Sequence, residues 1–498
     1  MKTPDQIINQ LQTEKIVILG LAREGISTYN FLRQILPNKQ LTLADQKTLD
    51  ELDPSFCRQL KQDKNAVFLS GSNHLEHLDQ FSLIFKTPGI PASLPSIDKA
   101  VRAGVKLSSN LQLFLEIVEA YKNQTQEPVG LDNPQPKITN REPIFGPLII
   151  GVTGTKGKST VSALTHHILK ENQLETVLIG NIGQPALDKL QQIGSKGKVV
   201  IEMSSHQLET MSISPDISII QKITSEHLDY YPNQQAYIDA KKPISMYQKV
   251  NQYIIYNPNY SHSAEVARLS PGYHLMYQLD PAFDIKVNLK SHYLTFRYRS
   301  QEPEKVIKLD EIPLLGQHNW LNVMPAIIVG RLIGLTNQQI AQAIRTFKPL
   351  PHRLELITQK SGVKYVNDSM ATMPDAQIAA LKAFAGSPIV LIAGGHERDQ
   401  DFSQTAKLIL EQSVKALILF PPTGQRLWAA LKQASKNQAA ANLPRHHFVN
   451  SMNQAVKLAA SEAKPGTVVL MSPGAASFGI FKNYADRGDQ FRKAVLDL

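Results

Sequence analysis

The chain has 498 residues, a formal net charge of +10 and a single cysteine, Cys57. This length exceeds what one compact core needs, so we expect two to four domains, and a lone cysteine excludes an internal disulfide or a cysteine-based metal site. Lysine and arginine are spread along the chain without a dense basic run, and no apolar run is long enough to cross a bilayer, so we expect a cytoplasmic protein that binds neither nucleic acid nor membrane.

The first segment, residues 15–107, alternates apolar runs with helical stretches, which is typical of a parallel α/β sheet. Strands are predicted at Ile16–Leu19, 41–44 and 83–85. The turn Gly20-Leu-Ala-Arg-Glu-Gly25 approximates a dinucleotide-binding fingerprint, but Ala22 replaces the glycine that lets the backbone approach a pyrophosphate. The turn therefore gives little support to an NAD site. Two interpretations stay open: a turn that only packs helix on strand, or a mononucleotide site in which Asp45 contacts a ribose or a base.

A polar stretch rich in Gln, Asn and Pro occupies residues 121–147. It shows little periodicity, so we expect an exposed linker or insertion. It separates the first α/β segment from a second one, which carries the strongest motif of the chain.

That motif lies in residues 148–169. The apolar run Leu148-Ile-Ile150 opens into Gly151-Val-Thr-Gly-Thr-Lys-Gly-Lys-Ser-Thr160, and a helical stretch follows. A strand, a glycine-rich turn and a helix N-terminus direct backbone N–H groups at an anion, so Lys158 would reach the outer phosphates of a nucleotide and Ser159 would hold Mg²⁺. Val152 stands where the general pattern has its first glycine. We nevertheless expect the loop to bind a nucleoside triphosphate.

Two polar residues follow predicted strands beyond this loop. Glu202 comes after the strand at 199–201, and His227 comes after the strand Ile217–Ile220. The carboxyl ends of parallel strands meet at one edge of a sheet, where ligands bind. A lone Glu or His is usually an ordinary residue, but two at successive strand ends beside a phosphate loop favour a divalent metal site.

The alternation of apolar strands with helical stretches continues to the end of the chain, with one interruption. A polar, aromatic stretch, residues 273–298, is interpreted as an antiparallel excursion of the second segment. A third α/β segment begins near Pro349. Its strands are predicted at 364–366, 389–393, 416–420 and Val468–Met471.

Several motifs, in order along the chain, resemble those of the ATP-dependent Mur ligases, the amide-forming enzymes of peptidoglycan precursor synthesis. The matching strings are Gly154-Thr-Lys-Gly-Lys-Ser-Thr160, Gly180-Asn-Ile-Gly183, Glu202-Met-Ser-Ser-x-Gln-Leu-Glu209, Glu226-His-Leu-Asp229, Gly316-x-His-Asn-x-x-Asn322 and His352-Arg-x-Glu355. The resemblance covers nearly the whole chain apart from residues 121–147. It implies an α/β protein of three domains: a Rossmann-like N-terminal domain, a central phosphate-loop ATPase-type parallel sheet and a Rossmann-like C-terminal domain. The implied parts are a UDP-substrate domain (1–120), the linker (121–147), an ATP-binding domain (148–348) and an amino-acid-binding domain (349–498).

Within that family, further strings point to the members that add D-glutamate to UDP-N-acetylmuramoyl-L-alanine. They are Thr87-Pro-Gly-Ile-Pro91, Asn367-Asp-Ser-x-Ala-Thr372, Ser472-Pro-x-x-Ala-Ser-Phe478 and Arg487-Gly-x-x-Phe491. The resemblance implies transfer of the γ-phosphoryl group of ATP to a substrate carboxylate, attack of an amine on the acyl phosphate, and release of ADP and phosphate. Positive charge and positioning dominate such a reaction, because it brings two anions together.

The resemblance also assigns roles to individual residues. The residues implied to bind ATP are Gly154, Thr155, Lys156, Gly157, Lys158, Ser159, Thr160, Asn319, Asn322, Arg353 and Asp368. Those implied for the UDP substrate are Asp45, Gly89 and Asn181, and those for the amino acid are Thr372, Arg398, Ser477 and Phe478. Two Mg²⁺ ions are implied, one held by Ser159 and Glu202 and one by His227 with a carbamate on Lys241. The catalytic set is Lys158, Glu202, His227 and Lys241.

Some positions depart from the family's pattern and keep alternatives open. Met370 stands where a lysine is usual, Met373 replaces an asparagine, and Glu24 stands where a small hydroxyl residue is common. The neighbouring Lys242 leaves the choice of the carbamylated lysine open. The alternatives are a Mur-type ligase that adds a different amino acid, a folate-type polyglutamate ligase, and a nucleotide-binding homologue with weakened catalysis. We expect small-molecule substrates and a monomer.

Overall fold

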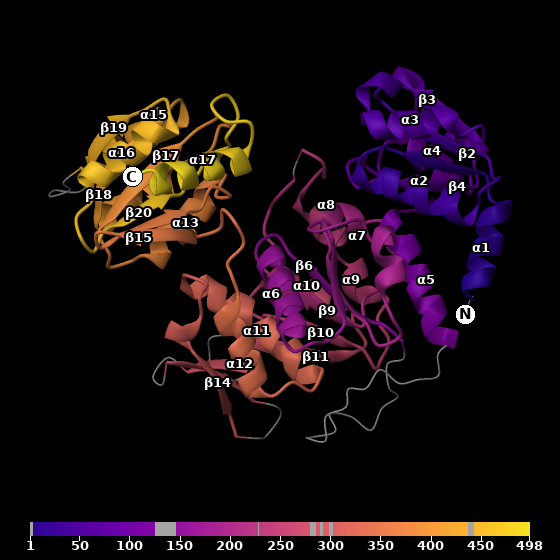
Figure 1. Ribbon diagram of the computed structural model, residues 1–498, viewed down its shortest axis with the longest axis horizontal. Coiled ribbons are helices and arrows are strands. Elements are labelled where there is room, and N and C mark those ends of the chain that lie inside the picture. The colour runs from indigo at the N-terminus through magenta and orange to yellow at the C-terminus, as the bar shows by residue number, and fades with distance from the viewer. Residues whose placement is uncertain are drawn as a thin grey trace. The chain divides into compact units, whose positions relative to one another are not determined.

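The computed structural model describes residues 3–124, 146–227, 229–278, 285–288, 292–297, 302–436 and 443–498. They form three β-sheets with helices packed on them (Figure 1), so the predicted α/β fold is confirmed. The chain divides into two compact units, which are described separately. The first unit is Met1–Glu311 with Leu321–Thr346, and the second is Ile312–Trp320 with Phe347–Leu498. No helix in the described ranges has the length and apolar character needed to cross a bilayer.

The first sheet, in the first unit, has five parallel strands in the order β3-β2-β1-β4-β5. The strands are β1 (Ile16–Leu19), β2 (Leu41–Asp45), β3 (Ala66–Ser70), β4 (Leu83–Lys86) and β5 (Lys106–Ser108). The helices are α1 (Pro4–Thr13), α2 (Arg23–Ile35), α3 (Pro54–Gln62), α4 (Pro95–Arg102) and α5 (Asn110–Gln124). Strands β1 and β4 are buried along their whole length, which explains their continuous apolar runs. The strand order reverses between them, so the loops after β1 and β4 open at the switch point where such sheets bind ligands.

Helix α5 connects the first sheet to the central one. Residues 121–124 of the predicted linker belong to this helix, and residues 125–145 lie outside the described ranges. The helix packs against α1, α2 and the 3-10 helix η4 (Leu187–Gln192). Its apolar side chains, among them Phe114 and Ile117, are buried in this contact. Burial of this face explains why the helix continues into a polar sequence.

The central sheet, also in the first unit, has nine strands in the order β14-β13-β12-β11-β10-β9-β6-β8-β7. The strands are β6 (Leu148–Thr153), β7 (Thr176–Gly180), β8 (Lys198–Glu202), β9 (Ile217–Ile220), β10 (Tyr253–Tyr256), β11 (Tyr273–Gln278), β12 (Ile285–Asn288), β13 (Tyr293–Phe296) and β14 (Glu304–Lys308). The helices are α6 (Lys158–Glu171), α7 (Ser205–Leu208), α8 (Gln234–Asp239), α9 (Pro243–Met246), α10 (Ser261–Ala267), α11 (Gln317–Leu332) and α12 (Asn337–Thr346). The first four residues of α11 belong to the second unit. Helix α6 packs on β6, β7 and β8, and α12 packs on α6 (Figure 1).

The predicted antiparallel excursion over residues 273–298 is only partly right. Strand β11 runs parallel to β10, and β12 runs parallel to β11. The physical reason is that α10 lies between β10 and β11 and returns the chain to the same end of the sheet, as in any βαβ unit. Antiparallel pairing begins between β12 and β13 and continues to β14.

Strand β6 places the phosphate loop between two other strand ends. It pairs in parallel with β8 on one side and with β9 on the other. In this register Val152 lies opposite Glu202, and Thr153 lies opposite Ile220. The loops that follow β8 and β9 therefore leave the sheet on either side of the phosphate loop.

The third sheet forms the second unit and has the order β15-β16-β20-β17-β18-β19. The strands are β15 (Glu355–Lys360), β16 (Val363–Asn367), β17 (Ile389–Gly394), β18 (Val414–Phe420), β19 (Arg445–Phe448) and β20 (Val468–Met471). The helices are α13 (Pro374–Ala383), α14 (Ser403–Glu411), α15 (Thr423–Ser435), α16 (Met452–Glu462) and α17 (Tyr484–Leu496). Only β15, which pairs with β16, is antiparallel.

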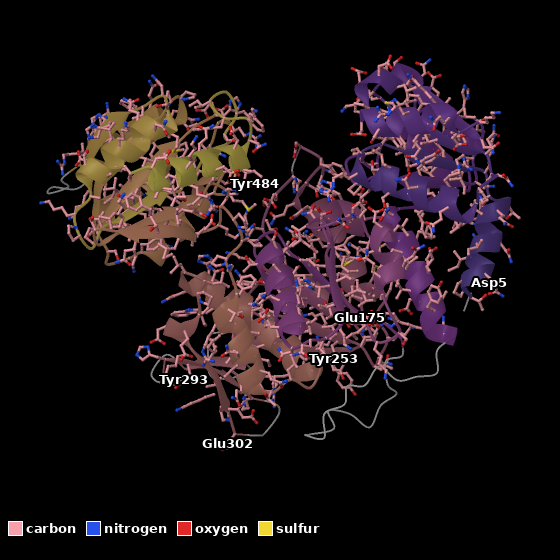
Figure 2. All side chains as sticks on the ribbon, in the orientation of Figure 1. Asp5, Glu175, Tyr253, Tyr293, Glu302 and Tyr484 are labelled. Atoms are coloured by element: carbon pink, nitrogen blue, oxygen red, sulfur yellow. The ribbon has the colours of Figure 1, made fainter. Side chains whose placement is uncertain are left out.

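Buried Arg487 ties α17, which begins at Tyr484 (Figure 2), to the loops of the third sheet. Its guanidinium donates to the carbonyl oxygen of Ser369 at 2.8 Å and to that of Ala475 at 3.0 Å. The carbonyl groups follow β16 and β20, so one side chain fixes both loops.

Candidate active site

The phosphate loop joins β6 to α6 and depends on two glycines with positive φ. Gly154 has a φ of 142° and Gly157 a φ of 91°. A Cβ atom at Gly157 would lie 2.5 Å from Oδ1 of Asn322, and one at Gly154 would lie 2.7 Å from the Cβ of Gln221. Neither position accepts a larger residue without displacing its neighbour. The same contacts place Asn322, a predicted ATP residue, against the loop.

Lys158 is the first residue of α6, and its side chain turns back over the loop. Its ammonium donates to the carbonyl oxygen of Gly154 at 2.8 Å and to that of Thr155 at 3.1 Å. Ser159 and Thr160 follow in the first turn, where the N–H groups of a helix lack partners within the helix and attract anions. A cation beside such a helix N-terminus suits the phosphates of a nucleotide.

The loop after β9 supports the phosphate loop from one side. The N–H of Thr155 donates to the carbonyl oxygen of Lys222 at 2.8 Å, and the N–H of Thr224 donates to Oγ1 of Thr155 at 2.9 Å. Lys156, on the outside of the phosphate loop, forms an ion pair of 3.0 Å with Glu226. The loop is therefore held by backbone and side-chain bonds before any nucleotide binds.

Lys241 is buried next to the phosphate loop, with 1% of its surface exposed. Its ammonium lies 3.3 Å from the carbonyl oxygen of Gly154 and 4.5 Å from the ring centre of Tyr237. Burial, and after it the positive charge of Lys158, holds the pKa of Lys241 well below its ordinary value. The adjacent Lys242 instead forms ion pairs with two surface carboxylates, those of Asp239 and Glu265. Of the two lysines, only Lys241 faces the loop.

His227 lies in the turn that follows β9 and has a left-handed backbone, with a φ of 58°. Burial lowers the pKa of its imidazole, although Glu226, with a carboxylate oxygen 3.9 Å away, opposes that shift. The ring is therefore neutral near pH 7, which is the form that binds a metal ion. The ring centre lies 6.1 Å from that of Tyr237, which in turn contacts Lys241.

Glu202 is the last residue of β8 and is fully buried. Its Oε1 accepts a hydrogen bond from the side chain of Asn181 at 2.8 Å, and its carbonyl oxygen accepts one from the N–H of Asn181 at 2.9 Å. Its Oε2 is buried without a hydrogen-bond partner among the described residues. A buried carboxylate oxygen of this kind is stabilised by a hard cation.

In the described part of the chain, no three His, Cys, Asp or Glu side chains gather into a group that would hold a metal by themselves. The predicted magnesium sites differ from such a group. Each uses one of these side chains together with Ser159 or Lys241, and phosphate oxygens of the nucleotide would complete it.

The predicted UDP residues of the first sheet differ in their surroundings. Asp45 ends β2, and its two carboxylate oxygens accept hydrogen bonds from the N–H groups of Leu21 at 2.6 Å and Lys47 at 2.9 Å. Asp45 thus holds the turn after β1. Gly89 is exposed in the loop after β4, and a Cβ atom there would meet no neighbour within 4 Å. The contact of Asp45 and of Gly89 with a UDP group stays a prediction.

Glu24 lies in the first turn of α2, near the switch point of the first sheet. The side chain of Gln207 donates to its Oε1 at 2.7 Å, and its Oε2 is buried with no partner in the described ranges. Burial raises the pKa of Glu24. A carboxyl group with a raised pKa binds a proton more readily, and its protonated form repels an anionic substrate less.

In the second unit, Asp368 follows β16 and lies beside Arg353. Its Oδ1 accepts from the N–H of Leu354 at 3.1 Å and its Oδ2 from the hydroxyl of Ser472 at 2.8 Å. Burial raises the pKa of Asp368 to about 7; the hydrogen bonds from Ser472 and Leu354, and after them the charge of Arg353, only partly oppose this. Asn319, the other predicted ATP residue of this unit, donates to the carbonyl oxygen of Leu315 at 2.6 Å.

This buried carboxyl group makes the stability of the second unit depend on pH. The folded pKa of about 7 exceeds the ordinary value of 3.8, so the stabilisation is complete below about pH 4 and is lost as the pH rises through 7. Relative to Asp368→Asn, the wild-type free energy of unfolding should fall by roughly 2–3 kcal/mol between pH 5 and pH 8. Urea unfolding of both proteins at the two pH values measures this. Equal pH dependence of the two proteins would contradict it.

The residues predicted for the amino acid lie on loops after β16, β17 and β20, which are neighbours in the sheet. The guanidinium of Arg398 lies over the ring of Phe478, with Cζ 5.6 Å from the ring centre. The side chain of Gln400 donates to the carbonyl oxygen of Thr372 at 3.2 Å. Ser477, next to Phe478, is buried. The structure thus places all four predicted residues at one edge of the sheet.

The two methionines that depart from the family's pattern have definite contacts. Nη2 of Arg353 lies 2.9 Å from the sulfur of Met370. Nε2 of Gln400 lies 2.9 Å from the sulfur of Met373, whose side chain is 44% exposed. Met370 replaces the family's lysine, but the guanidinium of Arg353 supplies a positive charge beside it. Met373 presents an apolar side chain near Thr372.

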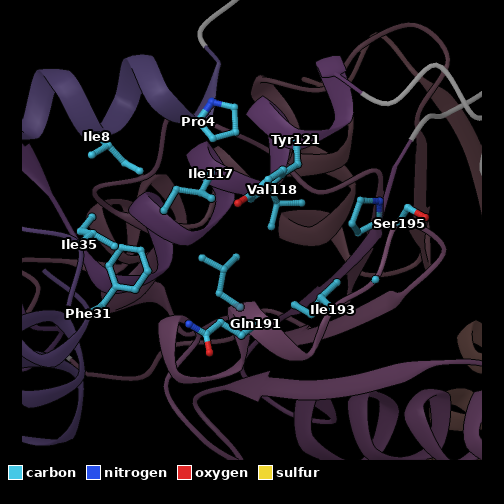
Figure 3. A pocket seen from close by; sticks show the side chains of 13 residues that line it. Pro4, Ile8, Phe31, Ile35, Ile117, Val118, Tyr121, Gln191, Ile193 and Ser195 are labelled. Atoms are coloured by element: carbon cyan, nitrogen blue, oxygen red, sulfur yellow. The ribbon is translucent and has the colours of Figure 1, made fainter.

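A cavity of about 460 Å³ lies between the helices of the first sheet and residues 190–195 (Figure 3). Apolar side chains line most of it, among them Ile8, Phe31, Ile117 and Ile193. No residue predicted for the site borders it. The cavity is therefore separate from the chemistry of the phosphate loop.

Three residues of the site were not predicted from the sequence. Tyr237 bonds Thr155 at 3.0 Å and packs on Lys241, Gln221 packs against Gly154, and Gln400 binds Thr372. Gln221 directly follows a strand beside the phosphate loop, and this position was an available signal. Tyr237 and Gln400 carry no such signal, because their contacts arise only when separate loops meet.

Three family models match the chain: the Mur ligase MurD-like N-terminal domain at residues 14–109, the Mur ligase middle domain at 152–330 and the Mur ligase glutamate ligase domain at 352–474. Relatives named UDP-N-acetylmuramoylalanine--D-glutamate ligase match end to end. The one from Symbiobacterium thermophilum is 31% identical over 97% of this chain and 98% of its own, and the one from Acetivibrio thermocellus is 28% identical over 98% and 97%.

Solved structures show the same fold at lower identity. The UDP-N-acetylmuramate-alanine ligase MurC of Thermotoga maritima matches with a TM-score of 0.53 at 17% identity, covering 97% of this chain and 99% of that one. MurF of Thermotoga maritima in complex with ADP matches with a TM-score of 0.53 at 16% identity, over 80% of this chain and 91% of that one.

Proposed function

Because the chain belongs to the Mur ligase family, we propose that it joins D-glutamate to UDP-N-acetylmuramoyl-L-alanine with ATP, through an acyl phosphate, and releases ADP and phosphate. The observation that carries the proposal is the buried Lys241 beside the phosphate loop. A loop that only stored a nucleotide would gain nothing from a second buried lysine next to Lys158, whereas phosphoryl transfer to a carboxylate needs further ligands at that point.

On the ATP side, the chain supplies positive charge and fixed hydrogen-bond donors. Lys158 and the N–H groups of the loop would bind the β- and γ-phosphates, and Asn322 would lie at the edge of the nucleotide. Asn319, Arg353 and Asp368 are further residues that we propose to bind ATP. Donors that are already in place when the γ-phosphoryl group moves do not need to reorganise, which lowers the barrier.

The residues present fit magnesium. The unpartnered Oε2 of Glu202 and the hydroxyl of Ser159 would hold one ion, and the neutral imidazole of His227 with Lys241 would hold the other. A lowered pKa increases the fraction of neutral amine, which would add carbon dioxide and release one proton to solvent, and the resulting carbamate is an oxygen ligand. When bound, the two ions supply the charge that lets two anions meet.

The substrate carboxylate would enter between these groups and the first sheet. The exposed loop at Gly89 and the side chain of Asn181 would contact the UDP-sugar part, and Asp45 would act by holding the turn after β1. Asn181 also bonds Glu202, so it would link the sugar site to the metal site.

For the incoming amino acid, we expect Arg398 to bind the distal carboxylate. Arg398→Met should raise the KM for D-glutamate by roughly 30-fold and leave the KM for ATP within about twofold, because the lost hydrogen bonds to a charged group contribute about 2 kcal/mol. Steady-state phosphate release measures both values. Arg445→Met, the same change at a surface ion pair with Glu462, is the matched control. An unchanged KM for D-glutamate in Arg398→Met would contradict the assignment.

The test of the function is product analysis. The protein should release phosphate only when ATP, Mg²⁺, UDP-N-acetylmuramoyl-L-alanine and the correct amino acid are all present. Because Met370 and Met373 border the amino-acid residues, the assay should be run with a mixture of all amino acids, and the product identified by mass spectrometry. We expect the D-glutamate adduct. No adduct with any amino acid would refute the function.

A further inference from the structure

The turn after His227 is bonded to a loop of the first sheet through one side chain, Tyr230. Its hydroxyl lies 2.7 Å from Oε1 of Glu209, 3.1 Å from the carbonyl oxygen of Ile90 and 3.5 Å from that of Pro88. Pro88 and Ile90 flank Gly89, the residue proposed to contact the UDP substrate. The phenol therefore reaches the backbone on both sides of that contact.

Lys86 completes a closed network around this hydroxyl. Its buried ammonium donates to Oε1 of Glu209 at 2.7 Å and to the carbonyl oxygen of Ile90 at 2.7 Å. The carbonyl oxygen of Ile90 and the carboxylate of Glu209 are thus bonded by the same two groups, the charged ammonium of Lys86 and the neutral hydroxyl of Tyr230. Removal of the phenol hydroxyl leaves both acceptors paired with Lys86, so the loss is specific to the link with Tyr230.

At its other end, Tyr230 contacts the turn that carries His227. The N–H of Tyr230 donates to the carbonyl oxygen of His227 at 3.0 Å. The ring of His206 lies between the two side chains, with its centre 4.2 Å from that of Tyr230 and 4.8 Å from that of His227. The left-handed backbone of His227 is strained for a residue with a side chain, so these neighbours help to hold it.

We propose that Tyr230 is a positioning residue that couples the loop around Gly89 to the imidazole of His227. Binding of the UDP substrate fixes that loop, and the loop, through Tyr230 and His206, fixes the ring that would serve the nucleotide site. Coupling of this kind is reciprocal, so each ligand strengthens the binding of the other by the same factor. The inference rests on the proposed function, because it takes the UDP substrate to bind at Gly89.

The test measures this factor directly, without turnover. The dissociation constant of adenylyl imidodiphosphate with Mg²⁺ is determined by calorimetry with and without saturating UDP-N-acetylmuramoyl-L-alanine. In the wild type we expect the UDP substrate to tighten binding of the analogue about tenfold. In Tyr230→Phe the factor should fall below about twofold, whereas the affinity for the analogue alone should stay within twofold.

Tyr231→Phe is the matched control, because it makes the same change one residue later in the same aromatic cluster. In the described ranges, no hydrogen bond joins the Tyr231 hydroxyl to residues 87–91, so this variant should keep the tenfold factor. Glu209→Gln is a second test of the network. It keeps an acceptor for Tyr230 but removes the charge, and it should reduce the factor to about threefold.

Each result decides between the inference and the function on which it rests. A factor near one in the wild type, a tenfold factor retained in Tyr230→Phe, or an equal loss in Tyr231→Phe would overturn the coupling through Tyr230 and leave the proposed function standing. Failure of the wild type to bind the UDP substrate at all would overturn both.

Discussion

Lys241→Met should lower kcat for phosphate release by about 10³-fold, the scale of effect seen when charge stabilisation at a transferring phosphoryl group is lost. Methionine fills nearly the same volume in a site that is 1% exposed, so the fold should persist. Lys242→Met is the control, since that lysine forms surface ion pairs and should tolerate the change within about twofold. A Lys241→Met protein within tenfold of the wild type, or an equal loss in Lys242→Met, would contradict the assignment.

The proposal of a carbamate on Lys241 can be tested further with alanine, a smaller side chain, at this position. Lys241→Ala leaves space beside the carbonyl oxygen of Gly154, which the lysine contacts. A short carboxylate such as acetate offers the same oxygen ligand as the carbamate, so it should restore part of the activity of this variant. An ammonium ion, which would replace the lysine's charge, should not. Rescue by ammonium ion alone would show that the cation, and not an oxygen ligand, is what the site requires.

The second large effect is expected at Lys158. Lys158→Met should lower kcat/KM for ATP by about 10³-fold, because the ammonium at the start of α6 would no longer meet the outer phosphates. The charge of Lys158 also lowers the pKa of Lys241, so its removal should raise that pKa and add to the loss. Steady-state kinetics over a range of ATP concentrations measures the effect.

Lys170→Met is the matched control for this variant. Lys170 lies in the last turn of the same helix and is exposed, so its removal should change kcat/KM by less than twofold. Full turnover in Lys158→Met would refute the role of the phosphate loop. A comparable loss in Lys170→Met would show instead that α6 tolerates no change of charge.

The sequence predicts the fold well where a strand is buried on both faces. Strands β1, β4, β9 and β20 are short apolar runs, and each lies within a residue of its predicted bounds. Strand β3 was not predicted, although its first four residues are apolar; its residues are partly or fully exposed, unlike those of the buried strands. The parallel course of β11 depends on the short α10, which composition alone does not reveal.

The site shows a similar division. The phosphate loop could be predicted because its chemistry requires consecutive residues, and Glu202 and His227 because they follow strands that flank it. The match to the family's pattern favoured Lys241 but left Lys242 open, since adjacent lysines differ only in which one the fold buries. The hydrogen bond from Asn181 to Glu202 was not predicted: it joins a residue predicted for the UDP substrate to one predicted for magnesium.

The central claim is that the terminal phosphate of ATP passes to a substrate carboxylate before the amide forms. UDP-N-acetylmuramoyl-L-alanine labelled with ¹⁸O in its terminal carboxylate tests this directly. Attack of that carboxylate on phosphorus, followed by displacement by the amine, leaves one labelled oxygen on the released phosphate. Mass spectrometry of the phosphate should therefore find one ¹⁸O atom for each turnover of doubly labelled substrate. Unlabelled phosphate, or AMP and pyrophosphate in place of ADP and phosphate, would contradict the account.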